Sequence, residues 1–121
     1  MATPVGPYSP IVRAGEWLIT SGQLGLDPSA TSPTLVTGGT AAQLAQALDN
    51  GRGLLEAHGA SIQDVVRGAI FLTNMDDFAA VNEVWIGFFG DHRPARSAIG
   101  VASLPMGADI EVELWAIAPS A

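Results

Sequence analysis

The stretch VVRGAIFLT, residues 65–73, decides the predicted fold. Its β-branched and aromatic residues are typical of a strand. Its second half is apolar at consecutive positions rather than at alternate ones. Because successive side chains of a strand point to opposite faces of a sheet, this pattern predicts a central strand with both faces covered.

A helix is predicted before this strand, from Thr40 to His58. Thr40 and Gln43 have the spacing of a capping box, and Gly59 is a typical residue just after a helix end. The apolar stripe of this helix consists of Leu44, Leu48, Gly51 and Leu55. A glycine within the stripe, at position 51, favours close packing of the helix onto a sheet.

A second helix is predicted after the strand, between Asn74 as its N-cap and Gly90 at its end. Asp76 and Asp77 lie in its first turn, where carboxylates interact favourably with the helix dipole. Its apolar stripe consists of Phe78, Val81, Trp85 and Phe88. Each of the two helices therefore has one apolar face to bury.

Four further strands are predicted at residues 11–13, 16–20, 97–102 and 109–118. The first two form a hairpin, and the glycines that follow, Gly22 and Gly25, indicate a bulge or a close approach of the backbone. Residues 27–39 are rich in Pro, Ser, Thr and Gly and predict a loop. The resulting order is ββαβαββ.

This order predicts one α+β domain over residues 1–121, with a mixed sheet and both helices on one face. Two helices can cover only one face of such a sheet, and 121 residues leave nothing for a third layer. We therefore expect another copy of the chain to cover the second face, so that the protein is a homo-oligomer.

The composition excludes several classes of function. The net charge is −7, with five arginines and no lysine, which argues against nucleic acid as a partner. The absence of cysteine excludes disulfides and thiolate catalysis. No apolar run is long enough for a membrane span and the N-terminus has no signal-peptide pattern, so we expect no membrane association and a cytoplasmic location.

Arg96 is the first candidate for a functional site. It lies between a loop and an apolar run, where an arginine can hold a carboxylate bidentately. Glu111 on the last strand is either a solvent-facing polar residue or a general base in a restricted cleft. Asn82 in the second helix either bonds a neighbouring loop or reaches the same cleft.

Four other residues have ordinary explanations as well as functional ones. Tyr8 is the only tyrosine and suits a packing role with its hydroxyl at the surface. Ser21 suits a turn, and no histidine and acid accompany it as a nucleophile requires. His58 and His92 are isolated, so we expect no metal site.

Several stretches of the chain together resemble the Rid family of reactive intermediate deaminases, also called the YjgF family. These stretches include Gly6-Pro7-Tyr8-Ser9, Thr20-Ser21-Gly22-Gln23, Phe71-Leu72-Thr73-Asn74-Met75, Ala80-Val81-Asn82-Glu83, Pro94-Ala95-Arg96-Ser97 and Ile110-Glu111-Val112-Glu113. The resemblance extends over residues 6–118. Its most specific part is the combination of PARS with a strand glutamate fifteen residues later and with TSGQ.

The resemblance implies a chorismate-mutase-like α+β fold and a homotrimer, in which three sheets form a central barrel with clefts between subunits. It implies hydrolysis of 2-imino acids, or of their enamine tautomers, to 2-keto acids and ammonia without a cofactor or metal. Arg96 would bind the substrate carboxylate and Glu111 would activate water. Tyr8, Ser21 and Asn82 would line the cleft, and more than one subunit would contribute them.

The chain departs from the family pattern at three positions. Ala98 stands where many members have cysteine, so that only its backbone carbonyl could contact the substrate or water. Trp85 stands where tyrosine is frequent, and Met106 stands where lysine is frequent. These residues are expected to alter the shape or the rim of the cleft.

Other functions remain open at the level of sequence. The same arginine would serve a non-catalytic trimer that binds 2-keto acids or small carboxylates, or a chaperone-like protein. Endoribonuclease activity has been attached to this family, but the negative charge and the absence of lysine disfavour it. Chorismate-mutase chemistry would need several cations around a dicarboxylate, and only Arg96 matches such a role.

Overall fold

The computed structural model describes residues 4–120. The three prolines and the glycine in residues 1–10 predict an extended N-terminal arm, and its first three residues lie outside the described part. Its helices and strands are β1 (Ile11–Ala14), β2 (Trp17–Thr20), α1 (Gly39–Ala57), β3 (Val65–Leu72), α2 (Phe78–Phe89), β4 (Ala95–Gly100) and β5 (Ile110–Ile117). Three short 3-10 helices at 62–64, 75–77 and 105–107 occur in the connections. The predicted ββαβαββ order is confirmed.

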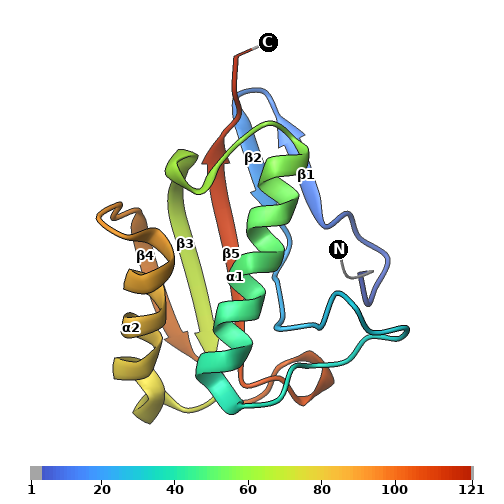
Figure 1. The fold of residues 1–121 in the computed structure, drawn as a ribbon, viewed down its shortest axis with the longest axis vertical. Helices are drawn as coiled ribbons and strands as arrows, with labels where there is room; N and C mark the ends of the chain where they lie inside the picture. Colours follow the sequence, from blue (N-terminus) through green and yellow to red (C-terminus); the bar gives the residue numbers. More distant parts are fainter. Residues whose placement is uncertain (1–3, 121) are drawn as a thin grey trace.

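The strands form one mixed sheet in the order β1-β2-β5-β3-β4. β3 and β4 are parallel, and the other neighbouring pairs are antiparallel. Figure 1 shows α1 and α2 side by side over the same face of the sheet, with α1 in front of β5. The predicted fold class, with two helices on one face of a mixed sheet, is therefore confirmed.

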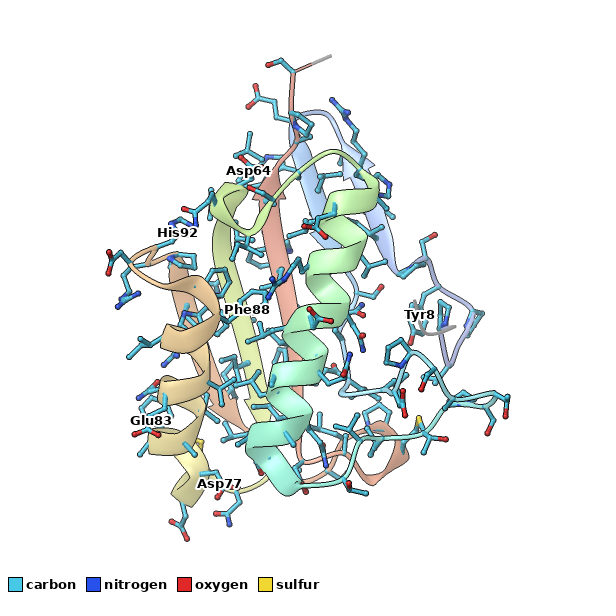
Figure 2. The ribbon with its side chains drawn as sticks, in the orientation of Figure 1. Tyr8, Asp64, Asp77, Glu83, Phe88 and His92 are labelled. Atoms are coloured by element: carbon cyan, nitrogen blue, oxygen red, sulfur yellow. The ribbon has the colours of Figure 1, made fainter. Side chains whose placement is uncertain are left out.

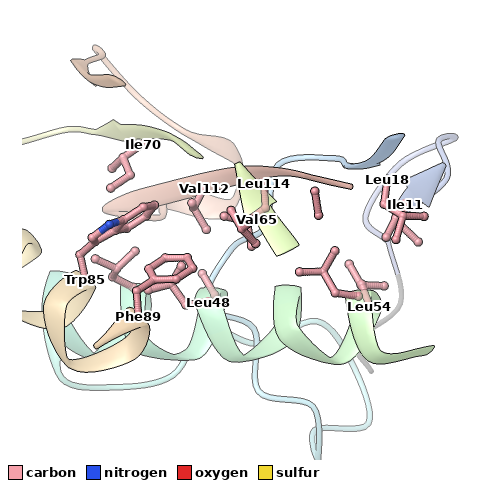
Figure 3. Close-up of a cluster of buried hydrophobic side chains, with 14 of the residues drawn as sticks. Ile11, Leu18, Leu48, Leu54, Val65, Ile70, Trp85, Phe89, Val112 and Leu114 are labelled. Carbon is pink, nitrogen blue, oxygen red and sulfur yellow. The ribbon is translucent and has the colours of Figure 1, made fainter. Parts of the chain in front are cut away.

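The core fills the layer between the helices and the sheet (Figure 3). The register of β3 against β5 pairs Ile70 with Val112 and Leu72 with Ile110, and all four side chains are fully buried. In α1 the predicted stripe is buried throughout. A Cβ on Gly51 would approach Leu114 Cδ1 to 2.9 Å, so this glycine permits the predicted close packing of helix and sheet.

The predicted capping box of α1 is wrong. The helix begins at Gly39, and its N-cap makes no side-chain hydrogen bond. Thr40 Oγ1 instead donates to Asp77 Oδ2 at 2.7 Å. Gln43 donates to Asp109 Oδ2 at 3.1 Å and accepts from the Asp109 backbone N–H at 2.9 Å. Both side chains thus tie α1 to neighbouring segments rather than to its own first turn.

The predicted stripe of α2 is partly wrong. Val81, Trp85 and Phe89 are buried, at a spacing of four residues, whereas Phe78 is 36% exposed. Phe88 faces α1 instead of the sheet, with the Arg52 guanidinium 4.5 Å from its ring centroid. The predicted N-cap Asn74 does accept a hydrogen bond, from Asp76, but it caps the short helix that precedes α2.

Strand β4 begins two residues earlier than predicted, at Ala95, because its parallel pairing with β3 starts there. Arg96 consequently lies inside the strand and not at a loop junction. Its neighbour in β3 is Gly68, and Ser97 and Ala98 pair with Ala69 and Ile70.

The face of the sheet away from the helices is open in a single chain and has a mixed character. Its larger apolar side chains include Val12, Trp17, Ile19, Phe71, Ile99, Trp115 and Ile117. Arg67 on this face is half-buried. It donates to Ser97 Oγ at 3.0 Å and lies 5.0 Å from the Trp115 ring centroid. The polar groups of this face thus lie among apolar ones.

The segment after β2 departs from the ladder with β5 and then rejoins it. Ile19 pairs with Trp115, and Gln23 pairs with Val112, so that the segment contains one extra residue. This irregularity confirms the predicted bulge.

No helix in the described chain is long and apolar enough to cross a membrane.

The side chain of Thr20 provides a hydrogen-bond partner for the backbone of β5 next to the bulge. Its buried Oγ1 accepts from the Leu114 backbone N–H at 3.0 Å. Thr20→Val keeps the shape of the side chain and leaves that N–H without its partner. We expect it to lower the free energy of unfolding by about 1–3 kcal/mol in urea denaturation. Thr20→Ser keeps the acceptor and is the matched control. A valine variant more stable than the serine variant would contradict this role.

Candidate functional site

The predicted site residues occupy two hollows rather than one. The register places Arg96 beside Gly68 and Gly68 beside Leu114, so Arg96 is on the helix-covered face of the sheet. Glu111 pairs with Phe71 and is on the open face. A single chain therefore does not bring Arg96 and Glu111 around one ligand.

The hollow at Arg96 lies at the edge of the sheet next to α2. It has a volume of about 330 Å³ and is lined by Asn82, Trp85, Ile86, Arg93, Pro94 and Arg96. Two of the five arginines of the chain thus line a hollow that has no acidic lining residue. In a protein with a net charge of −7, this local excess of positive charge suits an anionic ligand.

Arg96 is held on several sides within this hollow. Its Nη2 donates to Asn82 Oδ1 at 2.7 Å, so the two side chains are in direct contact. Its guanidinium carbon is 5.3 Å from the ring centroid of Trp85 and 5.6 Å from that of Phe78. Burial lowers the pKa of Arg96 from its ordinary value, but an arginine remains charged in proteins. The hollow therefore presents an oriented, partly desolvated cation.

The hollow at Glu111 lies on the other side of the sheet. It has a volume of about 400 Å³ and is lined by Tyr8, Ser21, Gly22, Pro105, Glu111 and Glu113. Figure 2 shows Tyr8 at the edge of the molecule opposite to Glu83 of α2. Three of the predicted residues, Tyr8, Ser21 and Glu111, are thus brought together here, away from Arg96.

The carboxyl group of Glu111 lies against the backbone of Gly22. A Cβ on Gly22 would overlap this carboxyl group, with Cδ only 2.6 Å away. Burial raises the pKa of Glu111, and the negative charge of Glu113 raises it further. A carboxylate with a raised pKa accepts a proton more readily than an exposed one, which suits Glu111 to general base catalysis.

Ser21 connects the hollow to the N-terminal arm. Its Oγ donates to the Ser9 carbonyl at 2.6 Å, and its backbone N–H donates to the Pro10 carbonyl at 2.8 Å. The hydroxyl hydrogen of Ser21 is therefore engaged with the segment that carries Tyr8. This geometry supports the predicted structural role of the serine and places Tyr8, which is 44% exposed, at the rim.

The remaining predicted positions contribute less directly. Ala98 is partly buried against the core and is not among the lining residues of either hollow. Within residues 4–120, no group of three or more His, Asp or Glu side chains is placed to hold a metal ion. His58 bonds the Leu54 carbonyl, and His92 Nε2 lies 2.7 Å from the Val65 carbonyl oxygen. His92 thereby anchors the loop that leads into β4.

Two residues that shape the hollow at Arg96 were not predicted from the sequence, and a third was predicted only in part. Phe78 was assigned only to a core stripe. Trp85 was expected to alter the shape of the cleft but not to contact Arg96, and both rings contact its guanidinium. Gly68 was treated only as part of the strand, although a Cβ there would overlap the Trp85 ring. A glycine in the middle of an apolar strand was the available signal, since it often marks a close approach.

The family model described as endoribonuclease L-PSP matches residues 1–118. The chain belongs to this family, which is also known as the YjgF or Rid family. A RutC family protein of Pyrococcus horikoshii is 41% identical over 91% of this chain and 86% of its own length. The human 2-iminobutanoate/2-iminopropanoate deaminase is 42% identical over 93% of this chain and 81% of its own.

Solved structures of family members have the same fold. RidA from an Antarctic Psychrobacter has a TM-score of 0.90 and 39% identity, and the match covers 96% of this chain and 92% of that one. Escherichia coli TdcF with bound serine has a TM-score of 0.89 and 31% identity, with coverage of 98% and 93%. The resemblance to the Rid family predicted from the sequence motifs is therefore confirmed.

The raised pKa of Glu111 predicts an effect on stability. A folded-state pKa above the unfolded value means that stability present at low pH is lost as the pH rises through the folded pKa. Glu111→Gln removes this loss, so we expect a higher thermal midpoint than wild type at pH 7–8. The gain should disappear below the ordinary pKa of a glutamate. Scanning calorimetry across pH measures it.

Glu56→Gln is the matched control for this substitution, because Glu56 is exposed on α1. Its thermal midpoint should follow that of wild type at every pH. A Glu111→Gln variant less stable than wild type at pH 7–8 would contradict the assigned pKa direction.

Proposed function

We propose that this Rid-family chain is a 2-imino acid deaminase that hydrolyses 2-iminobutanoate, 2-iminopropanoate or their enamine tautomers. The proposal rests on the contacts of Arg96. Asn82 and two aromatic rings orient its guanidinium toward a hollow without acidic residues. Relatives at about 42% identity that carry this activity in their names support the substrate class.

In this proposal Arg96 binds the α-carboxylate of the substrate. Its bond to Asn82 uses one terminal nitrogen, and the other N–H groups remain available for a bidentate pair with a carboxylate. The partial burial of the guanidinium strengthens such a pair relative to one in water. Arg96 thus provides binding and orientation of the C=N bond.

Glu111 acts as the general base in the reaction. It accepts a proton from water as the water oxygen bonds to the imine carbon, and the imine nitrogen takes up a proton from solvent. As the C–N bond of the resulting carbinolamine breaks, Glu111 returns its proton to the departing nitrogen and the hydroxyl group loses its proton to solvent, so that ammonia and the 2-keto acid are released. An imine is already a good electrophile, so positioning and one proton-transfer group provide the required chemistry without a cofactor or metal.

The active protein is a homotrimer in this proposal, with each site shared between two subunits. Arg96 and Glu111 are on opposite faces of one sheet, so a neighbouring copy must supply one of them. The open face, with Trp17, Val12 and Ile99 between 44% and 48% exposed, is the surface such a copy would cover. Tyr8 and Ser21 would then complete the site together with Glu111.

The direct test is imine clearance. An amino-acid oxidase generates 2-iminopropanoate, and semicarbazide traps what remains. We expect Arg96→Ala to raise KM about 10- to 100-fold, as for loss of a charge-assisted pair. We expect Glu111→Ala to lower kcat about 10²- to 10⁴-fold, as for loss of a general base. Clearance by Arg96→Ala at the wild-type rate would refute the proposed function.

Mixing the two impaired variants tests the shared site. After unfolding and refolding together, a chain with intact Arg96 can lie next to a chain with intact Glu111, and one complete site forms. We therefore expect activity to return in the mixture. Each variant refolded alone is the control. A trimer by analytical ultracentrifugation that regains no activity would mean that both residues act from the same chain.

A second candidate, a non-catalytic receptor for 2-keto acids, has one observation in its favour. The hollow at Arg96 is complete in one chain and contains no residue from the Glu111 side. Ligand binding that is lost in Arg96→Ala, unaffected by Glu111→Ala and without turnover would support it. Ribonuclease activity, which the description of the family model names, is disfavoured by the net charge of −7 and the absence of lysine.

A further inference from the structure

Trp85 makes an unusual set of contacts for a residue of a helix core. It is 4% exposed, and its ring centroid lies 5.3 Å from the guanidinium carbon of Arg96, within the range of a cation–π interaction. Figure 3 shows its indole directed from α2 toward the sheet, near Ile70. The side chain thus bridges the core and the hollow that it lines.

The place that the indole occupies exists because residue 68 is glycine. Gly68 pairs with Arg96 across β3 and β4, so a side chain at position 68 would stand beside Arg96 on the same face. A Cβ there would overlap Cη2 of Trp85 and lie 3.2 Å from Cζ2 and 3.4 Å from Cζ3. The indole therefore fills the recess that glycine leaves in the sheet.

The indole is also restrained by a second aromatic ring of α2. Phe89, one turn further along α2, is buried and packs against Trp85 with ring centroids 4.6 Å apart. Phe89 in turn contacts the ring of His92, which anchors the loop before β4. Trp85 is accordingly held by Phe89 and by the recess at Gly68, and its ring has little freedom to follow a moving guanidinium.

We infer that Trp85 and Gly68 form a coupled positioning pair for Arg96, in which glycine admits the indole and the indole sets the orientation of the guanidinium. This inference deepens the proposed function, on which it rests, because it concerns how Arg96 is presented to a substrate carboxylate. A bidentate pair requires the plane of the guanidinium to match that of the carboxylate. Asn82 restrains one terminal nitrogen, and Trp85 restrains the plane.

The inference predicts a binding defect rather than a chemical one. Trp85→Leu keeps an apolar core residue and removes the ring. We expect it to raise KM for 2-iminopropanoate, and Kd for 2-oxobutanoate by calorimetry, about tenfold. kcat should change by less than about twofold, because the substitution leaves unaltered the proton-transfer group, which in the proposed trimer is the Glu111 that a neighbouring copy supplies.

A double-mutant cycle tests the coupling of the two positions. Gly68→Ala alone displaces the indole, so we expect it to raise KM by several fold. The Trp85→Phe variant lacks the indole atom that a Cβ at position 68 would overlap. Adding Gly68→Ala to this variant should therefore raise KM no further. Gly87→Ala on α2 is the matched control, because its Cβ would meet no atom within 4 Å.

The outcomes separate this inference from the proposed function. If Arg96→Ala abolishes clearance while Trp85→Leu leaves KM and Kd at wild-type values and lowers only the thermal midpoint, the tryptophan is a core residue and the inference is wrong. Additive effects of Gly68→Ala and Trp85→Phe on KM would also overturn it. If Arg96→Ala retains wild-type clearance, the proposed function fails, and an unchanged Kd for 2-oxobutanoate in Trp85→Leu would then refute the positioning pair independently.

Discussion

The antiparallel ladder between β3 and β5 is the constraint on which the rest of the structure depends. Its register sets which side chains face the helices and which face the open side of the sheet. Ile70 and Val112 enter the core through this ladder, and Glu111 is directed away from the core by the same alternation. The parallel pairing of β4 with β3 then sets the opposite direction for Arg96. Core formation and the separation of the two hollows therefore have one cause.

The elements that local patterns determine were predictable from the sequence. The order ββαβαββ and the stripe of α1 follow from hydrophobic periodicity, and both were confirmed. The capping box failed because Thr40 and Gln43 find partners in Asp77 and Asp109, which are distant in sequence. The stripe of α2 failed at its end because Phe88 packs toward α1 and Phe89 toward the sheet. Tertiary contacts decided each case against the local pattern.

The candidate site was predictable in its members but not in its arrangement. Motifs singled out Arg96, Asn82 and Glu111, and the contact between Arg96 and Asn82 is present. The faces on which Arg96 and Glu111 lie depend on strand register, and a shift of one residue would exchange them. The alternation of apolar and charged residues in 110–114 does indicate that Glu111 points away from the core. No such pattern in residues 94–97 indicates the face of Arg96, which is set by pairing across the sheet.

The recess at Gly68 has a consequence for how this sequence can change over generations. A larger residue at position 68 is accommodated only if the ring at position 85 has already become smaller, because the two would occupy the same space. A smaller ring at position 85 that comes first leaves an empty recess but no overlap, which a protein tolerates more readily when its stability is sufficient. Mutational paths through these two positions are therefore directional, and related sequences should contain a small aromatic or aliphatic residue at 85 wherever 68 is not glycine.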